Sequence, residues 1–192
     1  MKAEQRKSSL RTEVAERLRE IDRSERQRSS GKIVEKILGT PIWKQCTAVL
    51  AYIPLASEAD ISSLIKKAFE QNIFVAVSRV DDDKLTFCQI KPDYEKILVK
   101  GSLGVHEPPK TLPPFDIKRH ESVLCIVPGV AFSISKERMG RGKGYYDRFL
   151  SAEGSSVFKM GVCFDTQIEQ KLPVDSFDVP MDMIISERRI IV

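Results

Sequence analysis

The sequence has few of the residues on which several functional classes depend. It holds only two histidines, and its four cysteines are far apart, at Cys46, Cys88, Cys125 and Cys163. They form no Cys-x-x-Cys pair, so neither a zinc site nor a disulfide-stapled secreted scaffold is indicated. No apolar run approaches the ~18 residues of a membrane span, and the first residues lack the apolar stretch of a signal peptide. We therefore expect a cytoplasmic protein without a membrane partner.

The composition is that of an ordinary folded protein. With 192 residues, 42% of them hydrophobic and 30% charged, the chain can bury a core as a single domain, residues 1–192. The net charge of +4 arises in residues 1–36, which hold 11 Lys and Arg against 7 acids. Glutamates are interleaved with these basic residues, as on a solvated helix face, so no nucleic-acid partner is expected.

The hydrophobic spacing predicts two helices before the first strand. Apolar residues at three- and four-residue steps indicate an amphipathic helix from about Lys2 to Asp22. A capping box formed by Ser24 and Gln27 predicts the start of a second helix, which ends at residues 39–41, Gly-Thr-Pro.

Short apolar runs then predict the strands of a sheet. Thr47–Tyr52 could also be a buried helix, but it and Ile73–Val77 flank a helix predicted to start near a cap at Ser57 and Asp60 and to end at Asn72. This order makes a βαβ unit of parallel strands. The alternation predicts an open α/β sheet with helices on both faces. The remaining predictions are a turn at 81–83, strands in 85–90, 123–127, 157–164 and 183–192, and a loop with short strands at 91–115.

A glycine-rich basic loop is the main chemical signal. Gly140-Arg-Gly-Lys-Gly144 places glycines at alternate positions, which lets the backbone approach a ligand closely. Tyr145–Leu150 then predicts a helix whose free N–H groups and positive dipole end would face the loop. With Arg138, the loop favours a polyphosphate. The pattern matches neither the dinucleotide-binding nor the P-loop fingerprint, so a solvated surface turn is the alternative.

A longer match surrounds the loop. Pro128-Gly-Val-Ala-Phe132, five residues, and Arg138-Met-Gly-Arg-Gly-Lys-Gly-Tyr-Tyr-Asp147 resemble the signature of the 5-formyltetrahydrofolate cyclo-ligase family, Pro-Gly-x-x-Phe, a spacer and Arg-Leu-Gly-x-Gly-x-Gly-Tyr-Tyr-Asp. The resemblance continues along the chain, in Lys7-Ser-Ser-Leu-Arg11, Tyr52-Ile-Pro-Leu-Ala-Ser-Glu-Ala-Asp60, Gly104-Val-His-Glu-Pro108 and Leu172-Pro-Val-Asp-Ser-Phe-Asp178.

The resemblance implies a fold and a reaction. The fold is a three-layer αβα, Rossmann-like (NagB/RpiA/CoA-transferase-like) open, mostly parallel sheet with two N-terminal helices. The reaction is the ATP-dependent cyclisation of 5-formyltetrahydrofolate to 5,10-methenyltetrahydrofolate, a ligase step of folate one-carbon metabolism. It would release ADP and phosphate through a phosphorylated formyl group, an iminium phosphate. ATP would be a co-substrate, Mg²⁺ the cofactor and the protein a monomer.

The resemblance also assigns roles by position. Lys143, Arg141 and Tyr145 would be catalytic, and Asp147 and Asp178 would bind Mg²⁺, although Mn²⁺ also accepts such oxygen ligands. The residues implied to bind ATP are Lys7, Arg11, Arg138, Gly140, Arg141, Gly142, Lys143, Gly144, Tyr145 and Tyr146. Those implied to bind the folate are Ile53, Glu58, Arg141, Gly142, Lys143, Gly144 and Tyr145.

Other interpretations of these residues remain open. Lys7 and Arg11 could be a solvated helical pair, Glu58 could simply favour a helix dipole, and Asp178 could be a turn residue. Substrate affinity and loop geometry are left open by four departures from the family pattern, Ser78, Ser133, Lys136 and Phe177. Two other functions also remain, a nucleotide-binding protein without folate chemistry and a basic module that binds nucleic acid.

Overall fold

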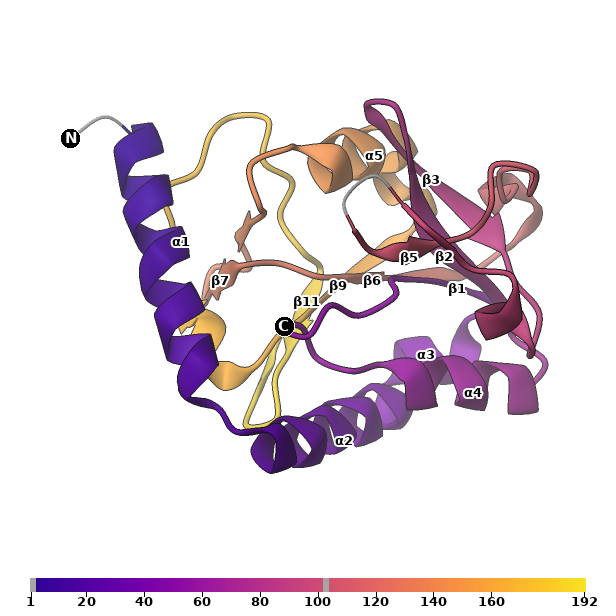
Figure 1. Ribbon diagram of the computed structural model, residues 1–192, viewed down its shortest axis with the longest axis horizontal. Helices are drawn as coiled ribbons and strands as arrows, with labels where there is room; N and C mark the ends of the chain where they lie inside the picture. Colours follow the sequence, from indigo (N-terminus) through magenta and orange to yellow (C-terminus); the bar gives the residue numbers. More distant parts are fainter. Residues whose placement is uncertain (1–2, 102–103) are drawn as a thin grey trace.

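The computed structural model describes residues 3–101 and 104–192, which form a sheet with helices on both faces (Figure 1). Its seven strands have the order β12-β11-β9-β6-β1-β2-β3. Neighbours from β11 to β2 are parallel, and β12 and β3 add antiparallel edges. The predicted open, mostly parallel αβα sheet is confirmed. Its strands are β1 (Ala48–Ala51), β2 (Phe74–Asp81), β3 (Lys84–Gln89), β6 (Val123–Val127), β9 (Phe158–Val162), β11 (Met183–Ile185) and β12 (Ile190–Ile191).

Different helices cover the two faces of the sheet. On one face, buried Ile37 of α2 and Leu64 of α4 belong to a single apolar cluster with Val49 of β1. On the other face, Leu150 of α5 packs in a cluster with Phe87 of β3. None of the described helices is long and apolar enough to cross a membrane. The helices are α1 (Ala3–Glu20), α2 (Arg23–Gly39), α3 (Pro41–Gln45), α4 (Ser62–Glu70) and α5 (Tyr145–Glu153).

The N-terminal helices differ from the prediction at their ends. Lys2, the predicted start of the first helix, lies outside the described residues. The capping box predicted at Ser24 is wrong, because the N-cap is Asp22, whose side chain accepts a hydrogen bond from the backbone N–H of Glu25. The chain leaves α2 after Gly39, as predicted, but α3 follows at once. Its cap is the Thr40 hydroxyl, which accepts from the N–H of Trp43.

The βαβ unit is confirmed, with a different cap. β1 and β2 pair in parallel on either side of α4. The N-cap of α4 is Ile61, which makes no capping side-chain bond, so the predicted position of the cap is wrong. The Asp60 carboxylate nevertheless accepts a 2.9 Å hydrogen bond from the N–H of Ser62, the first residue of α4. Asn72 ends the helix as predicted, with a φ of 57°. β2 then runs beyond Val77 and pairs with β3 around a turn at Asp82.

A small sheet beside the main one was not predicted. It contains β7 (Ala131–Ser133), β8 (Arg138–Met139) and β10 (Ile168–Glu169), which lie near α1 in Figure 1. The predicted 91–115 loop carries two short strands, β4 (Val99–Lys100) and β5 (His106–Glu107). Two of these short strands contribute charged side chains to cavities described below, Arg138 from β8 and Glu107 from β5.

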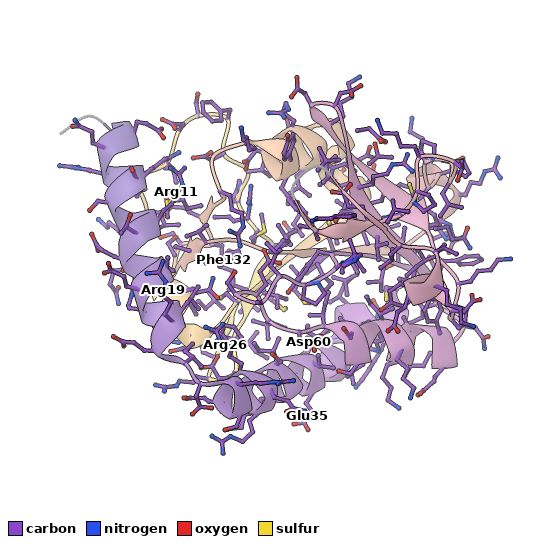
Figure 2. All side chains as sticks on the ribbon, viewed as in Figure 1. Arg11, Arg19, Arg26, Glu35, Asp60 and Phe132 are labelled. Carbon is purple, nitrogen blue, oxygen red and sulfur yellow. The ribbon has the colours of Figure 1, made fainter. Side chains whose placement is uncertain are left out.

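The Pro-Gly-x-x-Phe motif has a packing explanation. Phe132, labelled in Figure 2, is fully buried. A β-carbon on Gly129 would lie 2.7 Å from its Cζ atom, and one on Gly161 would lie 2.6 Å from its Cε1 atom. Both distances are shorter than real carbon contacts, so the ring requires glycine at both positions. The motif thus fixes the turn after β6, next to the glycine-rich loop.

Candidate functional site

The glycine-rich loop joins β8 to α5 in the way the sequence predicts. Gly142 and Gly144 have φ values of 95° and 65°, a left-handed region that a β-carbon would strain. Gly144 is the N-cap of α5 and supplies no side-chain cap. The first N–H groups of α5 are therefore available to an anion at the loop.

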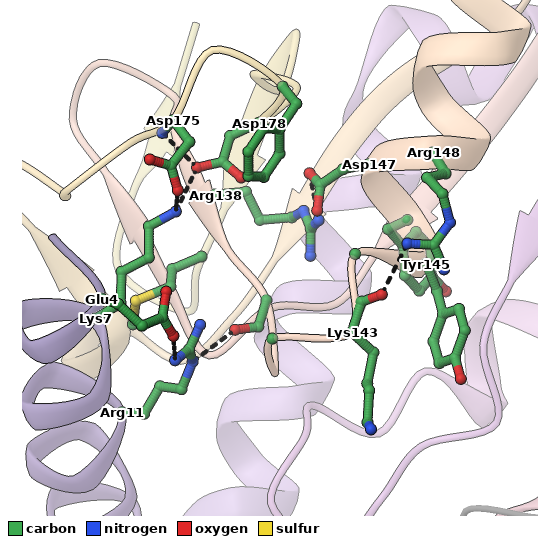
Figure 3. Close-up of a pocket in the computed structure, with 16 residues that line it drawn as sticks. Glu4, Lys7, Arg11, Arg138, Lys143, Tyr145, Asp147, Arg148, Asp175 and Asp178 are labelled. Carbon is green, nitrogen blue, oxygen red and sulfur yellow. Dashed lines mark hydrogen bonds and ion pairs between the residues drawn. The ribbon is translucent and has the colours of Figure 1, made fainter. Parts of the chain in front are cut away.

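A cleft of about 290 Å³ lies between α1, this loop and residues 175–178 (Figure 3). Of the ten residues that the sequence assigns to ATP, all except Arg141 line it. The two assigned metal ligands, Asp147 and Asp178, line it as well. The cleft thus joins segments that are about 170 residues apart in the chain.

Two cation–carboxylate clusters form the walls of the cleft. Lys7 Nζ lies 2.7 Å from both Asp175 Oδ2 and Asp178 Oδ2. Arg138 Nη2 lies 2.7 Å from Asp147 Oδ1, and these side chains are 3% and 11% exposed. Burial alone would lower the pKa of Lys7, but the two carboxylates raise its pKa overall. Lys7 and Arg138, which are assigned to ATP, therefore pair with Asp178 and Asp147, which are assigned to the metal.

The carboxylates fit a magnesium ion that is shared with a nucleotide. The hydrogen bonds of the described residues fall on one oxygen of each group, Oδ1 of Asp147 and Oδ2 of Asp178. Mg²⁺ is commonly held by one or two carboxylates, with substrate phosphates and waters as its other ligands. Within residues 3–101 and 104–192, no group of three or more acidic, His or Cys side chains could hold a metal. Phosphate oxygens would have to complete the coordination.

A second cavity borders the loop, and we call it the folate cavity after the residues that the family resemblance assigns to the folate. It is about 150 Å³ in volume, and four of the residues assigned to the folate line it, Ile53, Glu58, Arg141 and Tyr145. The other three, Gly142, Lys143 and Gly144, line the first cleft instead. Tyr145 and Tyr146 line both, so the two spaces meet at these rings.

Glu58 is held at the edge of the folate cavity. Its Oε2 atom accepts a 3.0 Å hydrogen bond from the N–H of Leu55, and its Oε1 atom lies 3.5 Å from Arg141 Nη2. The side chain is only 13% exposed, and burial raises its pKa despite these two partners. Arg141 itself is exposed and also donates to the Ser57 hydroxyl. Arg141 therefore lies at the folate cavity and next to residues of the loop that line the first cleft.

Sequence reasoning missed four charged residues of the site, of which Glu4 lines the first cleft and lies 3.4 Å from Arg11. Asp175 shares Lys7 with Asp178, Glu107 lines the folate cavity, and Arg148 holds the loop in place. Asp175 and Glu107 lie inside quoted motifs, but nothing in the sequence distinguishes them from loop residues. Arg148 follows the signature directly, and only its place in the first turn of α5 could have indicated its contacts.

Removal of Arg148 tests how rigid the loop must be. The guanidinium donates to the carbonyl of Lys143 at 2.9 Å and to that of Asp83 at 2.7 Å, and it lies over the Tyr145 ring. We expect Arg148→Met to weaken ATP binding by about fivefold, near the ~1 kcal/mol of one net hydrogen bond. Calorimetric titration with ATP checks this, with Arg119→Met, another exposed arginine, as the control. Equal affinity in both variants would show that the tether is dispensable.

Known proteins resemble this chain over most of its length. Residues 3–187 match the model of the 5-formyltetrahydrofolate cyclo-ligase family. The 5-formyltetrahydrofolate cyclo-ligase of Mus musculus is 26% identical, over 94% of this chain and 93% of its own. A probable 5-formyltetrahydrofolate cyclo-ligase of Caenorhabditis elegans is 28% identical, over 97% and 95%. The NMR structure of Aquifex aeolicus 5,10-methenyltetrahydrofolate synthetase superposes with a TM-score of 0.81 and 28% identity, over 96% of this chain and 91% of that one.

Proposed function

The chain belongs to the 5-formyltetrahydrofolate cyclo-ligase family, and we propose that it converts 5-formyltetrahydrofolate to 5,10-methenyltetrahydrofolate at the expense of ATP. The observation that carries this proposal is the pair of cavities on either side of one glycine-rich loop. One is lined by cations and two candidate metal ligands, and the other by apolar and aromatic side chains with Glu58. Their meeting at Tyr145 and Tyr146 supports transfer of a phosphoryl group from one to the other.

The reaction needs ATP because a formyl oxygen is a poor leaving group. In the proposed first step, this oxygen attacks the γ-phosphorus, and the bond from the γ-phosphorus to ADP breaks. N10 of the folate then attacks the formyl carbon, and the carbon–oxygen bond breaks as phosphate leaves. The proton lost from N10 departs with the phosphate. The product carries one positive charge, delocalised over N5, the former formyl carbon and N10.

The residues of the first cleft would position ATP. Phosphoryl transfer asks a protein mainly for positioning and charge neutralisation. Lys7, Arg138 and the loop N–H groups would bind the polyphosphate, while Arg11, which donates to the Gly140 carbonyl at 3.1 Å, also ties α1 to the loop. Asp147 and Asp178 would hold Mg²⁺, which when bound neutralises phosphate charge.

The residues between the cavities would act on the transferred group and its acceptor. Lys143 and Arg141 would stabilise negative charge on the γ-phosphoryl group. Glu58 and Tyr145 would hold the pterin, with apolar contact from Ile53. We propose that the protein acts as a monomer and as a single domain, residues 1–192. The cytoplasmic location stays a prediction.

Lys143 offers a direct test of the phosphoryl-transfer role. Its side chain is exposed and forms no ion pair with the described residues, so Lys143→Ala should leave folding intact. We expect turnover to fall at least about tenfold, a loss of ~1.4 kcal/mol in transition-state stabilisation. Lys66→Ala, on the exposed face of α4, is the matched control. Near-normal turnover in Lys143→Ala would remove Lys143 from this role.

The function itself is tested with the purified protein, 5-formyltetrahydrofolate, ATP and Mg²⁺. Methenyl product should appear, by its absorbance, together with one ADP per turnover. ATP binding without methenyl product, with either Mg²⁺ or Mn²⁺, would show a nucleotide-binding protein that lacks the folate chemistry. Steeply salt-dependent binding to DNA or RNA, with no product, would favour the nucleic-acid alternative.

A further inference from the structure

A second buried carboxylate lines the folate cavity, and the mechanism above gives it no role. Glu107, in β5, is 7% exposed and lines the cavity together with Glu58. The other lining side chains include the apolar Ile53, Val80 and Leu85. An ionised group among apolar neighbours is costly unless it is paired, so its presence calls for an explanation.

The position of the Glu107 carboxylate is fixed by its surroundings. Oε2 lies 3.4 Å from the backbone N–H of Val80, which is its only hydrogen-bond donor among the described residues. On the other side it packs against Gly101, where a β-carbon would lie 2.3 Å from Cδ of Glu107. Glycine at position 101 therefore makes room for the carboxylate against the β4–β5 hairpin.

No cation neutralises Glu107 at close range. Within the described part of the chain, it forms no ion pair shorter than 4.0 Å. The nearby Arg79 donates its hydrogen bonds to other groups, to Asp81 at 2.8 Å and to the carbonyls of Pro109 and Leu112 at 2.6 and 3.1 Å. Burial raises the pKa of Glu107, the sign of a carboxylate without adequate compensation. Glu58, by contrast, has Arg141 beside it.

The proposed reaction changes the charge of the folate that this cavity would bind. The formyl group is neutral in the substrate. After phosphorylation the carbon–nitrogen unit is an iminium cation, and the methenyl product keeps that positive charge. Fixed charges in a cavity that excludes water act strongly on charge that develops during a reaction. A negative group should therefore bind the intermediate and product more tightly than the substrate.

We propose that Glu107 is the electrostatic group of this site, which stabilises the cationic intermediate and product in preference to the neutral 5-formyl substrate. This inference rests on the proposed function and adds a specific role to it. Glu58, whose charge is partly offset by Arg141, then serves to hold the pterin in both states. The two carboxylates of one cavity thus have different tasks, set by their different partners.

Glu107→Gln removes the charge and keeps the shape. The amide oxygen can still accept from the Val80 N–H, so the thermal midpoint should stay close to that of the wild type. We expect affinity for 5,10-methenyltetrahydrofolate to fall about tenfold or more, while affinity for 5-formyltetrahydrofolate without ATP changes less than about twofold. Turnover should fall by a similar factor, with little change in the KM for 5-formyltetrahydrofolate. Fluorescence titration of both folates measures the difference.

Two comparisons make the test decisive. Glu95→Gln, an exposed carboxylate of the same connection, should change neither affinity. If Glu107→Gln weakens both folates equally, or neither, the electrostatic role is refuted, even though the wild type makes product. If the wild type binds neither folate and makes no product, the proposed function fails, and this inference fails with it.

Discussion

Replacement of Arg138 by methionine is expected to destabilise the protein by about 3–5 kcal/mol and to abolish measurable turnover. Arg138 is 4% exposed, and its guanidinium bonds to Asp147 Oδ1 at 2.7 Å while lying over the Tyr146 ring. Methionine fills the space but leaves Asp147 with one weak described donor, the N–H of Val179 at 3.4 Å. A buried carboxylate that has lost its cation is a far larger penalty than a broken surface pair.

A double variant separates the stability of this pair from its function. Asp147→Leu alone should also be strongly destabilising, because it isolates the buried guanidinium. Arg138→Met with Asp147→Leu should regain most of the loss, since an apolar pair removes both unpaired charges. Turnover should stay absent, because a nucleotide contact and a proposed metal ligand are both gone. Urea unfolding measures the first effect and methenyl formation the second. Wild-type unfolding in Arg138→Met, or turnover in the double variant, would contradict this account.

The elements that could be predicted are those with strong local signals. The short apolar runs of β1 and β6 are buried at every residue, as expected for parallel strands covered on both faces, and the order of the elements around them favoured strands over helices. The left-handed conformation of Asn72 follows from the tolerance of asparagine for positive φ. The loop-to-helix transition at Gly144 was predicted for the same kind of reason, because glycine and helix-start signals lie next to each other in the chain.

The elements that escaped prediction depend on distant partners. β7, β8 and β10 are two or three residues long, too short for a period of two to be visible. They exist because residues 131–139 fold back and because β10, about 35 residues later, pairs with β7. The predicted cap of α2 was wrong for a different reason. Asp22 and Ser24 are both good capping residues, and only the backbone geometry decides between them.

In the candidate site, too, features with a local sequence signal could be predicted and those that depend on distant residues could not. The loop could be predicted as an anion site from its own ten residues, and the folate role came only from the family resemblance. The pairing of Lys7 with Asp175 and Asp178 spans 168 and 171 residues, and no local pattern encodes it. The burial of Glu107 depends on a hairpin that packs against β2, so its charge could not be distinguished from that of a solvated loop residue.

Replacement of Glu58 by glutamine is expected to lower kcat/KM for 5-formyltetrahydrofolate about 100-fold, or ~2.7 kcal/mol, within the range for hydrogen bonds to a charged group. A pterin offers two adjacent N–H donors, which a carboxylate can accept together. The amide has one acceptor, and it must also serve the N–H of Leu55. The KM for ATP should change less than about twofold, because Glu58 lies in the folate cavity and not in the nucleotide cleft. Steady-state kinetics with each substrate varied in turn measure both values, and an equal loss for ATP would refute the division between the cavities.

The raised pKa of Glu58 gives this prediction a pH signature. Burial raises its pKa above the usual 4.5, so the carboxylate that binds the pterin should be lost at a higher pH than for an exposed glutamate. The acid side of the kcat/KM profile should therefore contain a Glu58 ionisation that is absent in Glu58→Gln. The free energy of unfolding should change with pH in the opposite direction to kcat/KM. Because the folded chain keeps a proton that the unfolded chain has released, the free energy of unfolding falls as pH rises from 4.5 through the raised pKa. In Glu58→Gln this contribution to the free energy of unfolding disappears. In the wild type, ionisation of Glu58 should therefore raise kcat/KM over the same pH interval in which it lowers stability.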